Sequence, residues 1–215
     1  MKLYSFEESG NSYKARLLFS LLNIDYELVN VSLLDDEQHQ APFITLNPRG
    51  EVPVLVDGAL VLRDSSAILL YVAGLHGKGE WWPTDIAAQA QIMEWLAFAA
   101  SWVQYGVFTA RALLSFGIPA NGLPADFPGE VLAGAVIRAH RSLEILETHL
   151  REHAWLAGGH PTIADIAVFP YIALAPMGDV SLDAYGAVQA WIARVKKLPG
   201  FVGMPGLDDP RYRRR

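Results

Sequence analysis

The sequence predicts two domains of different class: an α/β domain at residues 1–76 with the order β-α-β-α-β-β-α, and an all-helical domain at residues 86–215. Three observations carry this prediction. Short β-rich runs occur only early in the chain, apolar residues recur at helical spacing in the rest, and the composition changes between the two parts. The change falls at residues 77–85, where GKGEWWPTD mixes glycine, proline and charge, and we interpret this segment as the linker.

Local patterns define each element of the first domain. Lys2–Ser5 is a short β-rich run. Apolar residues on one face predict a helix over residues 12–22, with Ser12 as its N-cap. The turn Asp57-Gly58 between two apolar runs is typical of a hairpin. The other predicted elements are a strand at 26–31, a weakly helical segment at 35–46, hairpin strands at 52–56 and 60–62, and a helix at 65–75.

The second domain shows only helical periodicity. Apolar residues between 132 and 150 alternate in steps of four and three, which is typical of a helix with one buried stripe. The spacing Thr162-x-x-Asp165 predicts a capping box, which serves folding. The predicted helices span residues 86–116, 130–153, 162–174 and 184–198, with a loop at 117–129.

Composition excludes several classes of function. The net charge is −6, which argues against nucleic acid or an anionic membrane as partner. Cysteine is absent, so any thiol chemistry must use a thiol that a ligand brings. His149 and His153 are four residues apart, but no third ligand accompanies them, and we predict no metal site. Neither a secretory signal nor an apolar run of the ~18 residues that span a bilayer is visible, so we expect a cytoplasmic protein.

The segment from Leu46 to Ile68 contains the first candidate binding feature, a proline at the mouth of a predicted strand. If the Val52–Pro53 bond is cis, the backbone N–H and C=O of Val52 turn outward. An extended peptide would pair with them as an added strand does. A trans proline at a sheet edge is the equal alternative from the residues alone.

Two helix starts supply the other candidate features. Asp64-Ser65-Ser66 opens a helix whose free N–H groups and hydroxyl could bind a carboxylate, and Asp64 could bind an ammonium. Simple N-capping is the alternative explanation for the same residues. Ser9-Gly10-Asn11-Ser12 precedes the first helix. A hydroxyl donor beside oriented N–H groups lowers the pKa of a bound thiol, and a serine-rich turn is the plain alternative.

These segments resemble one family along nearly the whole chain. SGNSYKARLLFSLLNIDYELV, PFITLNPRGEVPVL and LRDSSAILLYV, followed by WPTDIAAQAQIMEWL, TIADIAVFPYI and AWIARVKKLPGF, are similar to the cytosolic glutathione S-transferase superfamily, and most to its serine-type, bacterial-like members with a Ser-x-Asn motif. The resemblance implies a thioredoxin-like domain followed by an all-helical domain.

The resemblance also implies a place for each part of the co-substrate glutathione. Val52, next to a cis Pro53, would pair with the cysteinyl part through its backbone. The γ-glutamyl head would meet the start of the third helix, and the glycyl carboxylate would meet a side chain ahead of Pro42. The residues assigned to glutathione in this way are Val52, Pro53, Asp64, Ser65, His39 and its rival Gln38.

Ser9 and Asn11 are the catalytic candidates, because serine-type members keep a thiolate-stabilising hydroxyl and a second donor there. Tyrosine-type members use the position that falls on Ser5, which makes Ser5 a minor rival. Tyr4 is one residue off, so we expect it on the opposite face of the strand and in the core. No cysteine-type mechanism and no Ser-Ser-Cys signature of maleylacetoacetate isomerases fits this chain.

The function that the resemblance implies is a homodimeric transferase for detoxification, which joins the glutathione thiolate to a hydrophobic small-molecule electrophile. A disulfide reductase or peroxidase using the same site, and a non-catalytic binding scaffold, stay open as alternatives. At helical spacing, three residues of the long helix share a face near its end, where such enzymes place the electrophile. The predicted pocket residues are Tyr105, Phe108 and Arg111, completed by Phe6.

Overall fold

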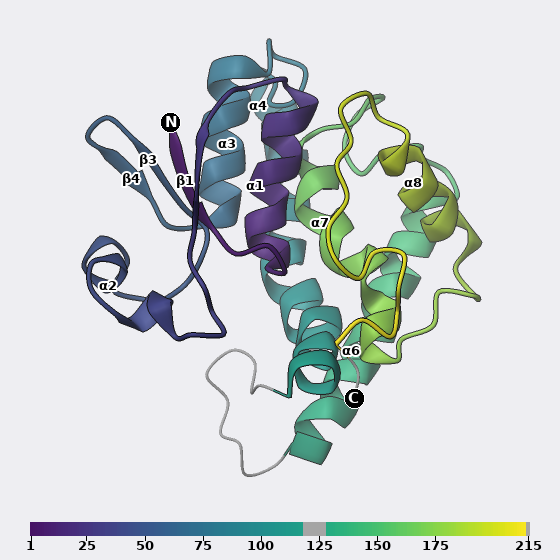
Figure 1. Ribbon diagram of the computed structural model, residues 1–215. Helices are drawn as coiled ribbons and strands as arrows, with labels where there is room; N and C mark the ends of the chain where they lie inside the picture. Colours follow the sequence, from purple (N-terminus) through teal and green to yellow (C-terminus); the bar gives the residue numbers. More distant parts are fainter. Residues whose placement is uncertain (118–127, 214–215) are drawn as a thin grey trace.

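The computed structural model describes residues 1–117 and 128–213, and it has an α/β half and a helical half (Figure 1). The chain follows the order that the sequence predicts in the first half. Its elements there are β1 (Lys2–Ser5), α1 (Gly10–Leu21), β2 (Glu27–Asn30), η1 (Glu37–His39), α2 (Phe43–Leu46), β3 (Val54–Asp57), β4 (Leu60–Leu62) and α3 (Ser65–His76).

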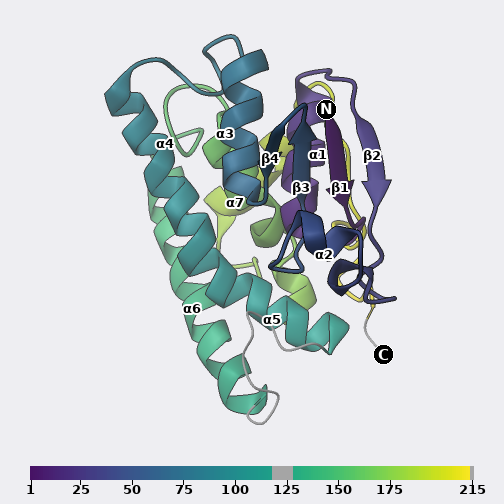
Figure 2. The ribbon, with the colours of Figure 1, turned by 90° about the vertical axis from the view of Figure 1, so that its left-hand side faces the viewer.

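The four strands form one mixed sheet in the order β2-β1-β3-β4. Strand β1 is parallel to β2 and antiparallel to β3, so Leu3 pairs with Leu28 on one side and with Leu55 on the other. Helices α1 and α3 lie on one face of the sheet and α2 lies by the other (Figure 2). This arrangement confirms the thioredoxin-like fold expected from the resemblance.

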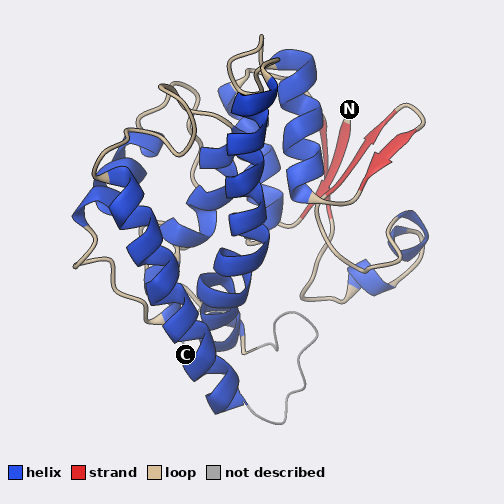
Figure 3. Ribbon diagram, turned by 180° about the vertical axis from the view of Figure 1, so that it is seen from behind, coloured by secondary structure: helices blue, strands red, loops and turns tan. Residues whose placement is uncertain are grey.

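The described residues of the second half form helices joined by loops, without strands (Figure 3). A continuous helical segment runs from Ile86 to Phe116, and parts of it have π-helical hydrogen bonding. The elements are α4 (Ile86–Phe98), η2 (Ala99–Phe108), α5 (Thr109–Arg111), η3 (Ala112–Phe116), α6 (Pro128–Leu150), α7 (Ile163–Ala173), η4 (Ala175–Gly178) and α8 (Gly186–Lys196). No helix among the described residues combines the length and apolar character that crossing a membrane requires.

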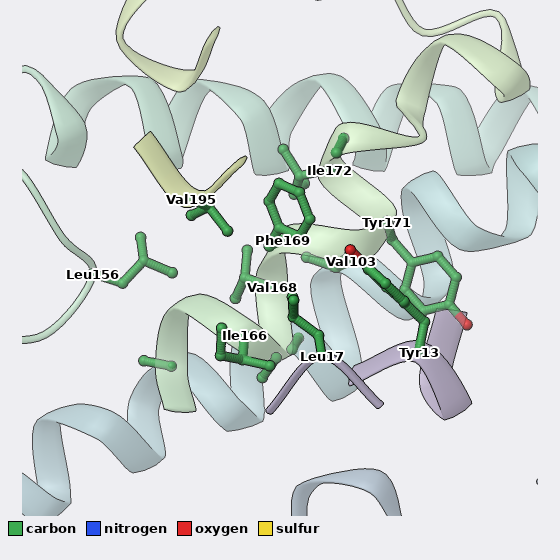
Figure 4. Close-up of a cluster of buried hydrophobic side chains, with 14 of the residues drawn as sticks. Tyr13, Leu17, Val103, Leu156, Ile166, Val168, Phe169, Tyr171, Ile172 and Val195 are labelled. Carbon is green, nitrogen blue, oxygen red and sulfur yellow. The ribbon is translucent and has the colours of Figure 1, made fainter. Parts of the chain in front are cut away.

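Helix α7 is the centre of the molecule, and all of its side chains are buried. Phe169 lies among apolar side chains from several helices, including Leu17 of α1 (Figure 4). The core is therefore continuous between the two halves, although α3 ends at His76 and α4 begins at Ile86. The predicted capping box is present at Thr162 and Asp165.

The prediction for the start of the first helix was wrong. Helix α1 begins at Gly10 with Ser9 as its N-cap, because the Ser9 Oγ accepts the N–H of Ser12. Ser12 lies inside the first turn and is fully buried. The structure also has η4 and a cis bond between Ala41 and Pro42, which were not predicted from the sequence. Of the loop predicted at 117–129, residues 118–127 lie outside the described residues.

Candidate functional site

The start of α1 brings together the residues that the sequence singled out for thiol chemistry. Ser9 has extended backbone and accepts the Ser12 N–H at an N···O distance of 3.2 Å. Ser12 in turn accepts the Phe6 N–H at 3.4 Å, which fixes the loop ahead of the helix. Ser9 and Asn11 are half-buried. Because the Ser9 hydroxyl hydrogen has no acceptor among the described residues, it is free to donate to a ligand.

The start of α3 is capped by Asp64. Its Oδ1 accepts the N–H groups of Ser66 and Ala67, at 2.8 and 3.1 Å. Simple N-capping is thus one function of Asp64. Within the described residues, its Oδ2 and both the N–H and the hydroxyl of Ser65 have no partner. These groups offer an acceptor for an ammonium and two donors for a carboxylate.

A buried amine connects the two helix starts. Lys14 of α1 is 3% exposed, and its Nζ donates to Asn11 Oδ1 at 2.9 Å. Burial lowers the pKa of Lys14 to about 8, and the negative charge of Asp64 opposes that shift. The charge of Asp64, at the start of α3, thus acts on a side chain of α1.

The bond between Val52 and Pro53 is cis, which resolves the even choice left by the sequence. The loop leading to it is fixed by fully buried Asn47, whose Nδ2 donates to the Glu51 carbonyl at 2.7 Å and whose Oδ1 accepts the Arg49 N–H at 3.2 Å. The backbone N–H and C=O of Val52 make no hydrogen bond with any described residue. They have the unpaired character that strand addition by a peptide requires.

His39 and Gln38 lie beside that loop. A Cβ on Gly50 would be 2.5 Å from the His39 ring, so the imidazole packs against the glycine backbone. Both side chains contact the same carboxylate oxygen of Asp36, with His39 Nδ1 at 2.6 Å and Gln38 Nε2 at 3.0 Å. The Gln38 Oε1 is buried without a partner in the described structure.

Neither Ser5, the rival candidate on β1, nor Tyr4 is available in the same way as Ser9. Ser5 is 2% exposed, and its Oγ accepts a hydrogen bond from Arg16. Tyr4 packs against Phe43 on the other face of the sheet, as expected, with ring centroids 6.0 Å apart. That face also has an open groove of about 730 Å³ lined by Tyr4 and Phe43, and none of the candidate site residues lies in it.

The predicted electrophile residues do not line one surface. Tyr105 is 51% exposed, whereas Arg111 is 3% exposed, so the two side chains do not lie together on an accessible surface. The π-helical bonding of this segment has more residues per turn than an α-helix and changes which side chains align. Phe108 packs on Tyr171 with centroids 4.9 Å apart, and Phe6 packs against the cluster that contains Val52.

A buried polar cluster next to Ser9 was missed by sequence reasoning. Glu8 is 6% exposed, and its Oε1 accepts hydrogen bonds from Tyr212 and Arg213 near the end of the chain. The Glu8 carbonyl accepts Nη2 of Arg111 at 3.2 Å. These residues lie far apart in the sequence, so no local pattern indicates that they meet. The only signal for the cluster was the presence of opposite charges in the loop and in the C-terminal segment. The cluster anchors the loop that presents Ser9.

The histidines do not form a metal centre. His149 and His153 have stacked rings 4.3 Å apart, and His149 faces the Trp155 carbonyl. Across the two described ranges, no group of three His, Cys, Asp or Glu side chains is arranged to hold a metal ion.

Comparison with known proteins places the chain in a family. Its residues 3–80 match the family profile "Glutathione S-transferase, N-terminal domain", and residues 129–194 match "Glutathione S-transferase, C-terminal domain". A glutathione S-transferase structure from Xanthobacter autotrophicus Py2 is 35% identical, with 97% of this chain and 98% of that chain covered and a TM-score of 0.85. The chain belongs to the glutathione S-transferase family.

Two further relatives bear on the chemistry. A glutathione transferase homologue from Drosophila mojavensis, solved with bound glutathione, is 25% identical over 92% of this chain and 88% of its own, with a TM-score of 0.80. A probable maleylacetoacetate isomerase from Caenorhabditis elegans is 28% identical over 93% of this chain and 90% of its own length.

Proposed function

We propose that this protein is a serine-type glutathione transferase, which conjugates glutathione to a hydrophobic electrophile. The observation that carries the proposal is that three segments have groups without a partner among the described residues: the Ser9 hydroxyl, the Val52 backbone, and the Asp64 and Ser65 groups. Glutathione is a tripeptide with two carboxylates, an ammonium and a thiol. It can therefore supply a partner for each of these protein groups.

The binding pose follows from the chemistry of those groups. The cysteinyl backbone pairs with the N–H and C=O of Val52 next to cis Pro53. The γ-glutamyl carboxylate accepts from the Ser65 N–H and hydroxyl, while Asp64 Oδ2 accepts from the ammonium. His39, with Gln38 beside it, donates to the glycyl carboxylate.

Ser9 and the start of α1 tune the thiol. A free thiol has a pKa near ~8.5 and is mostly protonated at neutral pH. Donation from the Ser9 hydroxyl and the potential at the helix start both favour the thiolate. Asn11 supplies a second donor. The thiolate sulfur then attacks an electrophilic carbon, a thioether bond forms, and a leaving group such as halide departs with its bonding electron pair.

The electrophile site lies between the loop after β1 and the long helix. Phe6 and Phe108 offer apolar rings, Tyr105 is accessible, and Arg111 holds the loop through the Glu8 carbonyl. The protein acts as a cytoplasmic homodimer. Exposed apolar side chains on α3, α4 and η2 support a subunit interface there, namely Leu70, Leu75, Met93 and Trp102.

Isomerisation is a second candidate reaction. The C. elegans relative is named a probable maleylacetoacetate isomerase. A thiolate that adds reversibly to a conjugated double bond permits rotation about the resulting single bond, and its departure regenerates the double bond in the other geometry. The same Ser9-based site would serve both reactions.

Calorimetry and a substrate panel test the proposal. We expect the protein to bind glutathione with one site per chain and to conjugate a halogenated aromatic. A small disulfide and a cis-dienoate in the same panel measure the reductase and isomerase alternatives. The absence of glutathione uptake contradicts the proposal, and binding without turnover of any substrate favours a scaffold.

A further inference from the structure

Lys14 is a buried amine without a carboxylate partner. Its side chain is inside the protein, and no carboxylate of the described residues lies within ion-pair distance of it. Placing an ammonium in such surroundings is costly, as the lowering of the Lys14 pKa to about 8 by burial shows. A hydrophobic residue would fill the same space without that cost.

Groups from three helices act on the amine. On α1, Asn11 accepts its hydrogen bond at 2.9 Å. On α7, the ring of Tyr171 lies with its centroid 5.3 Å from Nζ, which is a cation–π distance. At the start of α3, the carboxylate of Asp64 opposes the loss of the Lys14 charge.

Tyr171 fixes this arrangement from the helical half. Its ring packs against the backbone of Gly10, where an added Cβ would lie 2.5 Å from Cε1. Burial raises the pKa of Tyr171 to about 12, so the hydroxyl stays neutral. The first turn of α1 thus packs directly against α7.

The hydrogen bond between Lys14 and Asn11 determines which way the carboxamide points. An ammonium has only donors, so it accepts no contact from the Asn11 NH2 group and binds the carbonyl oxygen. With Oδ1 held inward, the Nδ2 group is directed away from Lys14, and it has no acceptor among the described residues. Both of its hydrogens therefore remain available to a ligand.

From this geometry we infer that Lys14 is a positioning residue for the thiolate site, which orients Asn11 as a donor to the glutathione sulfur and places a buried positive charge behind it. The inference rests on the proposed function. It extends that function by assigning a role to a residue that contacts no substrate.

In this role, the charge of Lys14 and the charge of the bound thiolate stabilise each other. A positive charge in a poorly solvated position interacts more strongly with an anion than it does in water. When the thiolate binds, it supplies the counter-charge that Lys14 lacks. Each charge then stabilises the other, so loss of the Lys14 charge must raise the pKa of the bound thiol.

The test measures the thiol pKa rather than activity alone. We would titrate bound glutathione by thiolate ultraviolet absorbance and record the pH dependence of kcat/KM for wild type, K14M and K14R. We expect K14M to raise the thiol pKa by about one unit, which lowers turnover about tenfold at pH 6.5 and little at pH 9. K14R keeps the charge and a donor, so it should restore most of the low-pH activity.

Asn11 provides the matched control. N11A should raise the thiol pKa as well, and adding K14M to N11A should have a smaller effect than K14M alone, because the two residues act through one contact. If K14M does not fold, as judged by circular dichroism, K14Q takes its place, because it lacks the charge and keeps a polar head.

The outcomes separate this inference from the proposed function. If wild type binds no glutathione, the proposed function is wrong. If wild type binds glutathione and a folded K14M binds it with an unchanged thiol pKa, the role of Lys14 is wrong. Fully additive shifts in the double variant would also overturn the positioning role.

Discussion

The helices α7 and α1 both begin with a hydroxyl N-cap, but only α7 also has an acidic residue in its first turn. Thr162 and Ser9 are N-caps with extended backbone whose hydroxyls accept a backbone N–H. At α7, Asp165 completes a capping box and is fully buried. Its carboxylate also accepts from the Leu156 N–H and the Trp191 indole N–H. At α1, no acidic residue stands in the first turn.

The difference shows how one local signal serves two purposes. An acidic residue in the first turn neutralises the positive potential of a helix start and ties it to its surroundings. A start capped only by a half-buried hydroxyl keeps that potential for an external anion. We therefore expect changes at α7 to affect stability and changes at α1 to affect chemistry, and the following variants test this division.

Substitution of Asp165 should have the largest effect. D165A leaves the N–H groups of Thr162, Leu156 and Trp191 without their acceptor inside the core, so we expect a loss of about 3–5 kcal/mol of unfolding free energy. Urea unfolding measures it. The exposed N-cap Asp85 is the matched control, since D85A should cost only about 1 kcal/mol. Equal losses in the two variants would remove the distinction.

Substitution of Ser9 should give the reverse result. We expect S9A to lower kcat/KM about 100-fold, or about 2.7 kcal/mol of transition-state stabilisation, while the loss of a cap costs about 1 kcal/mol of stability. Steady-state kinetics measured across pH should also show a raised kinetic pKa. S101A alters an exposed serine that bonds only within its own helix, so it should behave as wild type. An S9A pH profile like that of wild type would mean that Ser9 does not act on the thiol.

The pH dependence of stability should report Asp165. Burial raises its pKa to about 6, against hydrogen bonds from Thr162, Trp191 and Leu156 that favour the charged form. The folded state then holds a proton that the unfolded state releases above pH ~4. The contribution of Asp165 to the free energy of unfolding is complete below pH ~4 and is lost as the pH rises through 6. Its size is on the order of 2 kcal/mol. Unfolding of wild type and D165N between pH 4 and 8 measures it, and parallel curves would contradict this titration.

A conservative change at the start of α3 should have the smallest effect. Asparagine caps a helix as well as aspartate does, so D64N should leave stability nearly unchanged. It removes the charge that we assign to the glutathione ammonium, and we expect about tenfold weaker binding, or about 1.4 kcal/mol. Calorimetry measures the difference, with D85N as the equivalent change at a cap without a proposed ligand. Unchanged affinity would limit Asp64 to capping.

Much of the first domain was predictable because its signals are local. Strand Lys2–Ser5 and the hairpin around Asp57-Gly58 depend on alternation and turn chemistry within a few residues. Local signals also indicated the starts of α1 and α3, although the first was placed at Ser12 instead of Ser9. A cap is decided by one hydrogen bond, and Ser9 and Ser12 both have the required hydroxyl.

The surroundings of the site were not predictable in this way. Contacts between Lys14 and Tyr171, or between Glu8 and Tyr212, join residues that are distant in the chain. Arg111 was predicted to line the electrophile pocket from regular helical spacing, whereas it is buried and donates to the Glu8 carbonyl. No local pattern in the sequence indicates contacts between residues that are so far apart in the chain.

The sequence by itself determined the order of the elements, the hydroxyl and carboxylate caps, and the absence of a thiol, because each depends on residue type and short spacing. Only the tertiary structure decided which helix start stays open, how the Asn11 amide is held and which charges are buried. The physical reason is that hydrogen bonding and desolvation depend on which distant segments exclude water, and packing of the whole chain sets that.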